Sequence, residues 1–217
     1  MKKLLINEIF LSIQGEGFNT GKAFVFVRLS GCNLDCSFCD TTHNTVNFTM
    51  NENELMDYIE EKWECRSILW TGGEPMKQLI GEQIHFFNFH GFYQAIETNG
   101  TINTLGFLFD FITVSPKQGT KIAVQFCEEI KLLCDEKGLL FEGYLPMMEI
   151  IDNIEHLQNI EAPADVPLNP DLYIYISPVF NGEALRKKVL QKALDIIKEH
   201  PNVYRLSVQN HKLWGIT

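Results

Sequence analysis

Short apolar runs rich in β-branched and aromatic residues alternate along the chain with stretches in which apolar residues recur at helical spacing. The runs predict strands at residues 23–29, 67–71, 93–97, 111–114, 129–133, 172–176 and 204–208. The helical spacing, seen in Leu55, Ile59 and Trp63, predicts helices at residues 52–63, 76–88, 149–160 and 182–200. Residues 162–170 contain three prolines and predict a loop. This alternation is typical of one α/β domain, here residues 1–217, with about six mainly parallel strands.

Polar and glycine-containing segments follow five of the predicted strands. They are residues 31–32, 71–74, 97–98, 115–117 and 177–178. Because parallel β-α sheets and barrels bring the C-terminal ends of their strands to one face, we expect these segments to surround a single active-site mouth.

Composition limits the choice of partners. The chain has 217 residues, of which 45% are hydrophobic and 21% charged, as in ordinary soluble domains. A formal net charge of −10 would repel nucleic acid, so a small-molecule ligand fits better. Asn7 and Glu8 interrupt the apolar start before a signal peptide can form, and no apolar stretch is long enough to span a bilayer. We therefore expect a cytoplasmic protein without membrane contact.

Three of the six cysteines, Cys32, Cys36 and Cys39, lie within eight residues. In a reducing compartment such a group indicates metal binding rather than disulfides. Asp40 or His43 could complete a structural zinc site. Three thiolates alone could instead hold an iron–sulfur cluster with one iron open to an exogenous ligand, which favours reaction chemistry. The other cysteines, at positions 65, 127 and 134, fit packing roles.

The CxxxCxxC spacing after the first predicted strand, with Phe38 before the last cysteine, resembles the radical S-adenosylmethionine (SAM) superfamily. Members of that superfamily hold a 4Fe-4S cluster with three thiolates, and SAM chelates the fourth iron. Residues 72–75 match the superfamily's GGEP motif, which receives the methionine amino group. Two glycines allow backbone oxygens to approach that amine, and Glu74 either adds charge or braces the loop.

Further segments resemble the 7-carboxy-7-deazaguanine synthase family over nearly the whole chain. They are residues 7–10, 13–17, 26–28, 31–32, 39–41, 97–101, 114–117 and 209–212. The resemblance implies a radical ring contraction of 6-carboxy-5,6,7,8-tetrahydropterin to 7-carboxy-7-deazaguanine with loss of ammonia, in queuosine and 7-deazapurine biosynthesis. It also implies an incomplete radical-SAM-type β/α barrel, since 217 residues are few for a full ring of about 250.

Residue roles follow from the resemblance by position. The implied pterin contacts are Ile13, Gln14, Gly15, Arg28, Thr71, His211 and Thr217. The implied SAM contacts are Phe38, Cys39, Asp40, Gly73, Ser115, Pro116, Lys117, Ser177, Pro178, Val179 and Phe180. Cys32, Cys36 and Cys39 are the implied cluster ligands and Thr41 the implied Mg²⁺ ligand, while the radical forms on SAM rather than on a catalytic side chain.

Several of these assignments have a plainer alternative. Arg28 could brace Glu16 or Glu74 as a structural ion pair, and Thr41 could be a turn cap. Lys117 could be an ordinary exposed lysine. Ser177-Pro178 stands where the family often has Gln-Pro, which leaves that contact open, and the sequence does not decide whether Glu97 faces the mouth or a loop amide.

The resemblance further implies a substrate-binding N-terminal extension, residues 1–22, and a C-terminal tail, residues 209–217, that closes the site; a frayed tail is the alternative. It implies a homodimer and a flavodoxin or ferredoxin-type reductant. Two other functions are open at this point. A glycyl-radical-enzyme activase would share the cysteine spacing, and a zinc-binding module without enzyme activity would share the thiols.

Overall fold

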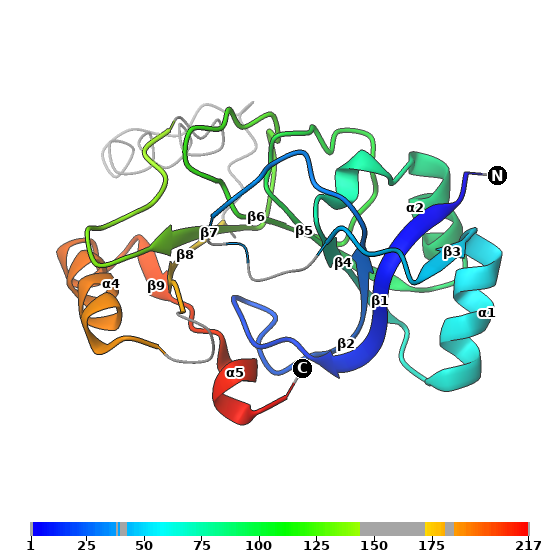
Figure 1. Cartoon of the computed structure of the whole chain (residues 1–217), viewed down its shortest axis with the longest axis horizontal. Coiled ribbons are helices and arrows are strands. Elements are labelled where there is room, and N and C mark those ends of the chain that lie inside the picture. The colour runs from blue at the N-terminus through cyan, green and yellow to red at the C-terminus, as the bar shows by residue number, and fades with distance from the viewer. Residues whose placement is uncertain (1, 38, 40–42, 144–171, 181–184, 217) are drawn as a thin grey trace, which may run out of the picture.

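One nine-stranded sheet organises the chain, in the order β3-β1-β2-β4-β5-β6-β7-β8-β9. The computed structural model describes residues 2–37, 39, 43–143, 172–180 and 185–216. The strands are β1 (Leu4–Ile13), β2 (Ala23–Leu29), β3 (Phe48–Met50), β4 (Ser67–Gly72), β5 (Tyr93–Thr98), β6 (Phe111–Val114), β7 (Glu129–Cys134), β8 (Tyr173–Pro178) and β9 (Tyr204–Leu206). Figure 1 shows them as a curved, open arc with helices on its outer side.

The sheet is mostly parallel, which confirms the predicted fold class. Strands β2 and β4 to β9 pair in parallel with their neighbours, whereas β1 pairs antiparallel with both β2 and β3. Over the described residues β3 and β9 are the two edges, so the arc stays unclosed. The estimate of about six strands was too low. Polar Asn7 and Glu8 interrupt the apolar run of β1, and β3 has only three residues, so neither strand had a clear sequence pattern.

Helices α1 (Glu52–Lys62) and α2 (Gly81–Phe89) cover one end of the arc, and α4 (Lys187–Glu199) covers the other (Figure 1). A short helix, α5 (Asn210–Trp214), follows β9. Helix α1 begins with a capping box, in which Asn51 Oδ1 accepts from the Glu54 amide and the Glu54 carboxylate accepts from the Asn51 amide. Among the helices of the described residues, none is both long and apolar enough to cross a membrane.

The predicted helix at 76–88 is wrong as a single element. A 3-10 turn, η1 (Pro75–Lys77), comes first, and α2 begins only at Gly81. The side chain of Gln78 explains the break, because its amide donates to the carbonyls of Leu5 (3.0 Å) and Ser30 (2.6 Å) and fixes the chain against β1. Ile80 is then extended, at φ −128° and ψ 155°.

Two C-terminal boundaries also differ from the prediction. Helix α4 begins at Lys187 rather than at residue 182, since Arg186 has the extended backbone of a helix cap (φ −72°, ψ 129°). Strand β9 ends at Leu206 rather than Val208. The helix predicted at 149–160, the loop predicted at 162–170 and residues 182–184 of the predicted last helix lie outside the described residues.

Alternation along the strands separates two layers of core. In β2, Val25, Val27 and Leu29 face the helices, whereas Phe24 and Phe26 face the inside of the arc. The inner layer is aromatic and closes the interior below the strand ends, which leaves polar side chains at the ends themselves. The fold therefore places an apolar layer beneath polar strand ends, where a binding site can form.

Candidate functional site

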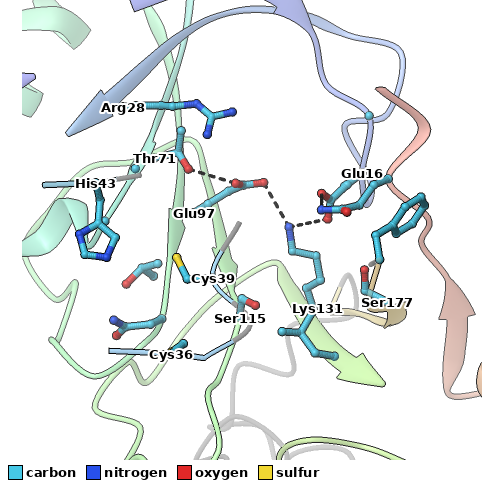
Figure 2. Close-up of a pocket in the computed structure, with 18 of the residues that line it drawn as sticks. Glu16, Arg28, Cys36, Cys39, His43, Thr71, Glu97, Ser115, Lys131 and Ser177 are labelled. Atoms are coloured by element: carbon cyan, nitrogen blue, oxygen red, sulfur yellow. Dashed lines mark hydrogen bonds and ion pairs between the residues drawn. The ribbon is translucent and has the colours of Figure 1, made fainter. Parts of the chain in front are cut away.

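A cavity of about 700 Å³ lies inside the arc at the C-terminal ends of the strands (Figure 2). Each of the five polar segments predicted at strand ends contributes to its lining, which confirms that they meet at one mouth. The contributing residues are Cys32, Thr71, Gly72, Gly73, Glu97, Thr98, Ser115, Lys117, Ser177 and Pro178. Parallel pairing is what brings these distant segments together.

The cysteine loop follows β2, and all three of its cysteines line this cavity. Cys32, Cys36 and Cys39 each line it, and the Cys39 amide donates to the Cys36 carbonyl at 3.0 Å. Burial raises the pKa of the Cys36 thiol, and the neighbouring thiols of Cys32 and Cys39 raise it further, although Lys117 opposes them. Cys65, Cys127 and Cys134 are not among the lining residues. The donor set on the loop is thus three thiols, which fits a cluster bound by three thiolates.

The thiols are adjacent but are not arranged as a finished metal site. Within the described part of the chain, no three His, Cys, Asp or Glu side chains form a group that could hold a metal ion. The sulfurs would therefore converge as a cluster binds, as is common where metal binding and loop folding are coupled. His43, one of the two residues considered as a zinc ligand, lines the same cavity, and Asp40 lies outside the described residues.

The GGEP turn packs directly against the start of the cysteine loop. The Glu74 amide donates to the Gly31 carbonyl at 3.0 Å, and the Gly73 amide donates to the Leu29 carbonyl at 3.0 Å. A Cβ at position 73 would overlap the Gly31 carbonyl oxygen, and Gly72 has φ +118°, where L side chains are strained. Two glycines are needed because the two backbones touch.

Glu74 braces the loop rather than adding charge to the mouth. Its side chain is fully buried and accepts from Thr98 Oγ1 (2.8 Å) and from the amides of Asn99 (2.8 Å) and Met76 (3.0 Å). Burial raises the pKa of this carboxyl, against the opposing effect of the three donors. The GGEP turn is thereby fixed to the end of β5.

Asn33 joins the cysteine loop to the same strand end. Its Oδ1 accepts from Asn99 Nδ2 at 2.9 Å, and its Nδ2 donates to Thr101 Oγ1 at 2.7 Å. The three motifs at residues 32–39, 72–75 and 97–101 are therefore one hydrogen-bonded unit. Sequence analysis identified each motif but not the residue that links them.

A buried ion-pair cluster lies at the same mouth. Lys131 Nζ lies 2.8 Å from Glu16 Oε2 and 3.4 Å from Glu97 Oε1 (Figure 2). Glu97 also accepts from Gln14 Nε2 (3.0 Å) and Thr71 Oγ1 (3.2 Å), so it faces the mouth and does not satisfy a loop amide. Sequence analysis missed Lys131, although a lysine inside an apolar strand was a usable signal.

Burial and pairing act against each other in this cluster. Burial alone would raise the pKa of Glu16, but the adjacent Lys131 ammonium outweighs it and holds that pKa below its usual value. Burial would likewise lower the pKa of Lys131, yet Glu16 and Glu97 together raise it. Both partners of the 2.8 Å pair are therefore charged at neutral pH.

Arg28 reaches the mouth from β2 and pairs with a neighbour on β1. Its Nε lies 3.3 Å from Glu8 Oε2, and its guanidinium lies over the Phe10 ring at 5.4 Å. The alternative ion pairs with Glu16 or Glu74 are wrong, because Lys131 and backbone amides bind those carboxylates. Arg28 still lines the cavity.

The N-terminal loop and the C-terminal helix lie against each other beside the cavity. The Asn210 amide donates to the Gly15 carbonyl at 3.1 Å, and Gln209 Nε2 donates to Glu16 Oε1 at 3.0 Å. A Cβ on Gly15 would lie 2.6 Å from His211 Nδ1, so α5 sits against a position that has no room for a side chain. Residues 210–214 of the tail form a short helix.

The sequence of the chain is similar to that of radical SAM enzymes. Residues 26–118 match the family model described as Radical SAM superfamily. The chain is 35% identical to the 7-carboxy-7-deazaguanine synthase of Bacteroides thetaiotaomicron, over 97% of each protein. It is 32% identical to the synthase of Bradyrhizobium diazoefficiens, over 97% of this chain and 98% of the relative. The chain belongs to the 7-carboxy-7-deazaguanine synthase family.

A solved structure agrees with that assignment at the level of the fold. QueE from Escherichia coli superimposes with a TM-score of 0.67 at 22% identity, covering 95% of this chain and 94% of QueE. The activity of the family, 7-carboxy-7-deazaguanine synthesis by a radical SAM lyase, is the function of the chain. The family also implies a 4Fe-4S cluster and SAM. The activase and the zinc module are not favoured.

Two later strand ends supply residues that the family resemblance implied. Lys117 is not an ordinary exposed lysine, since its Nζ donates to the Ser115 carbonyl (2.8 Å) and Oγ (2.6 Å) at the cavity wall. Burial lowers the pKa of Lys117 to about 8, and the charge of Lys131 adds to this effect. Ser177 is buried at the end of β8 and lines the cavity with residues 178–180.

The implied site residues of the synthase family divide into three groups. Those that line the cavity are Ile13, Gln14, Gly15, Arg28, Cys32, Cys36, Cys39, Thr71, Gly73, Ser115, Lys117, Ser177, Pro178, Val179, Phe180 and His211. Pro116 is buried and is not a lining residue. Phe38, Asp40, Thr41 and Thr217 lie outside the described residues.

Proposed function

We propose that the cavity binds SAM and 6-carboxy-5,6,7,8-tetrahydropterin side by side, and that the chain converts this pterin to 7-carboxy-7-deazaguanine. One observation carries the proposal. Cys32, Cys36 and Cys39 line the same cavity as the Lys131–Glu16–Glu97 cluster. A redox cofactor and a polar heterocycle could therefore meet at close range, which is the main contribution a protein makes to cofactor chemistry.

Cys32, Cys36 and Cys39 would hold the 4Fe-4S cluster. When bound, the cluster would supply the electron for reductive cleavage of SAM and so the radical chemistry needed at C6 of the pterin. The loop itself contributes rigidity, since Asn33 and Glu74 fasten it to the end of β5. The aromatic floor below the mouth excludes water from the reacting carbon.

The SAM contacts would come from the sheet side of the cysteine loop. Gly73 would offer backbone oxygen to the methionine amine, while Ser115 and Lys117 would bind its carboxylate, with Pro116 shaping the turn. Lys117 already donates to two oxygens of Ser115, and with its pKa near 8 it is mainly protonated at neutral pH. The remaining proposed contacts are Phe38, Cys39, Asp40, Ser177, Pro178, Val179 and Phe180.

The pterin contacts would come from β2, β4 and the two chain ends around the same cavity. Gln14, Arg28 and Thr71 bring donors and acceptors to its lining, and Ile13 and Gly15 line it as well. His211 and Thr217 would cover the substrate from the tail. On this proposal residues 1–22 and 209–217 act as the two substrate-binding ends of one radical SAM domain, joined by the Gly15–Asn210 hydrogen bond.

Mg²⁺ would assist the rearrangement, with Thr41 as its protein ligand. One hydroxyl is a small ligand set, so the substrate carboxylate and waters would complete the shell. Thr41→Ala should leave SAM cleavage intact but lower turnover roughly tenfold and weaken the response to added Mg²⁺. Turnover titrated with MgCl₂ checks this, and an unchanged Mg²⁺ response in the variant would remove Thr41 from the site.

The proposal also covers the location and the partners of the protein. The chain would form a homodimer in the cytoplasm, and a flavodoxin or ferredoxin-type protein would deliver the electron. Analytical ultracentrifugation of the purified protein tests the dimer, since a single species at the monomer mass would contradict it.

Spectroscopy of the reconstituted protein tests the cofactor part of the proposal. Anaerobic reconstitution should give the electron paramagnetic resonance signal of a reduced 4Fe-4S cluster, and SAM should change that signal. Cys36→Ala should lose the signal, whereas Cys65→Ala, a thiol outside the cavity, should keep it. Absence of a four-iron centre, or a centre that SAM does not perturb, would overturn the proposal.

A further inference from the structure

Lys131 connects two carboxylates that come from distant parts of the chain. It lies in the middle of β7, with a side chain only 9% exposed, between Glu16 of the N-terminal loop and Glu97 at the end of β5 (Figure 2). Figure 2 shows its ammonium aimed at the mouth from below the two acids. A buried lysine is costly unless it is paired, so this placement needs a purpose other than simple packing.

The two acids depend on Lys131 to different degrees. Glu97 also accepts from Gln14 Nε2 and Thr71 Oγ1, so two neutral donors hold its carboxylate as well. Glu16 accepts from Gln209 Nε2 in addition to Lys131, and burial acts strongly against its charge. The charge of Glu16 therefore rests mainly on Lys131.

Other charged groups face this cluster from the neighbouring elements. Glu129 comes from β7 itself, Lys117 from the segment after β6, and His211 from α5. The charges of Lys131 and Lys117 repel each other, which lowers the pKa of Lys117. His211 weakly lowers the pKa of Glu16 and so favours its ionised form. These groups tune the cluster, and Lys131 forms an ion pair with both Glu16 and Glu97.

We propose that Lys131 is a positioning residue for the ring contraction, which fixes Glu16 and Glu97 as two acceptors for the N–H donors of the pterin. This inference rests on the proposed function. The aminopyrimidinone edge of a pterin carries adjacent N–H donors, and ionised carboxylates are the strongest acceptors for them. Lys131 itself stays behind the acids and does not need to touch the substrate.

The proposal separates substrate binding from SAM chemistry. Lys131→Met should raise the KM for the carboxypterin roughly tenfold or more, while SAM binding and cluster content stay as in the unaltered protein. Without the ammonium, burial should raise the pKa of Glu16, so the acidic limb of the pH dependence of kcat/KM should move upward by about one unit. Lys131→Arg, which keeps the charge, should retain most of the binding and the original pH limb.

A readout without any cofactor tests the same claim directly. In protein labelled with ¹³C at the glutamate carboxyl carbon, the Glu16 resonance, assigned with Glu16→Gln, should titrate at higher pH in Lys131→Met. Lys3→Met is the matched control, because it removes an exposed ion pair. In that pair Lys3 Nζ lies 3.4 Å from Glu54 Oε2. The control should match the unaltered protein in KM, pH limb and Glu16 titration.

A second variant keeps the test informative if Lys131→Met fails to fold. If Lys131→Met does not unfold cooperatively, the double variant Glu16→Gln with Lys131→Met removes the unpaired buried charge and restores the fold. That variant should still show the raised KM, since Glu97 has lost its ammonium partner and position 16 has lost its charge.

An unchanged KM together with an unchanged Glu16 titration in a folded Lys131→Met protein would overturn the inference. Failure of the unaltered protein to make 7-carboxy-7-deazaguanine would overturn the proposed function instead. The two failures are therefore distinguishable.

Discussion

Glu74 shows how one buried carboxylate can hold two motifs together. Both of its oxygens are occupied, one by Thr98 and Met76 and the other by the Asn99 amide. A carboxylate can accept all three bonds, whereas an amide of the same shape brings its own N–H groups against one of these donors. The motif therefore has a glutamate at this position because three hydrogen-bond donors point at its side chain.

Glu74→Gln should lower the free energy of unfolding by about 2 kcal/mol, the usual cost of an unsatisfied buried group. The loosened cysteine loop should also lose bound iron faster than the unaltered protein. Urea denaturation and timed release of iron to a chelator measure the two effects. Glu64→Gln, on an exposed residue, is the control. Equal iron release from Glu74→Gln and the control would contradict the bracing role.

Glu129 gives the protein a distinctive pH dependence of stability. Its buried carboxylate accepts from the Phe18 amide at 2.7 Å, and burial raises its pKa from 4.5 to about 7. A carboxyl with a raised pKa in the folded state favours folding at low pH. Its contribution is complete below about pH 4.5 and is lost as the pH rises through about 7.

Glu129→Gln should remove this dependence. Between pH 5 and 8 the unaltered protein should lose on the order of 2 kcal/mol of unfolding free energy relative to the variant, as follows from the pKa difference. Gln keeps an oxygen that accepts from Phe18, so the loop stays in place. Parallel pH dependences for the two proteins, measured by urea denaturation, would show that Glu129 does not titrate as expected.

Sequence patterns predicted single chemically distinctive residues better than their partners. The cysteines, the GGEP residues and Glu97 stand out because their types and spacing are unusual. Lys131 did not, since its role depends on pairing with Glu16 across more than one hundred positions of sequence, which only the folded sheet reveals. The alternative partners considered for Arg28, Glu16 and Glu74, did not include Glu8 for the same reason, because β1 was not recognised as its neighbour.

At the scale of elements, the closest dependence is between the N-terminal loop and α5. They are separated by almost the whole chain, yet they lie side by side at the mouth (Figure 1) and share the Gly15–Asn210 hydrogen bond. Gly15 has no room for a methyl group against His211. This contact makes the two ends of the chain one wall of the site.

Gly15→Ala should push α5 away from the loop. We expect a rise in the KM for the carboxypterin of roughly tenfold and faster proteolysis near residues 209–216, with little change in SAM cleavage without substrate. Gly81→Ala is the matched control, because a Cβ there meets nothing within 4 Å. An unchanged KM in Gly15→Ala would show that the tail does not need this contact.

Element predictions succeeded where local pattern and burial agree. The predicted bounds of β2 and β6 are those of the structure, because both strands have continuous apolar runs. Predictions failed where tertiary contacts decide. The Gln78 side chain ends η1 by bonding to β1 and β2, and β1 itself forms as an antiparallel strand that local pattern did not indicate.

On the scale of the whole molecule, an open parallel arc collects strand ends from the length of the chain into one mouth (Figure 1). The cysteines, the GGEP turn and the charged cluster of Lys131, Glu16 and Glu97 line this mouth together. On the proposed function, the cysteines and the GGEP turn would bind the cofactors, and the charged cluster would bind the substrate in the same cavity.

The most direct test is an anaerobic turnover of the reconstituted protein with 6-carboxy-5,6,7,8-tetrahydropterin, SAM, Mg²⁺ and a chemical reductant. Mass spectrometry and ultraviolet absorbance should show 7-carboxy-7-deazaguanine with release of ammonia, and Cys36→Ala should give none. A fully reconstituted protein that cleaves SAM yet forms no ring-contracted product would contradict the account.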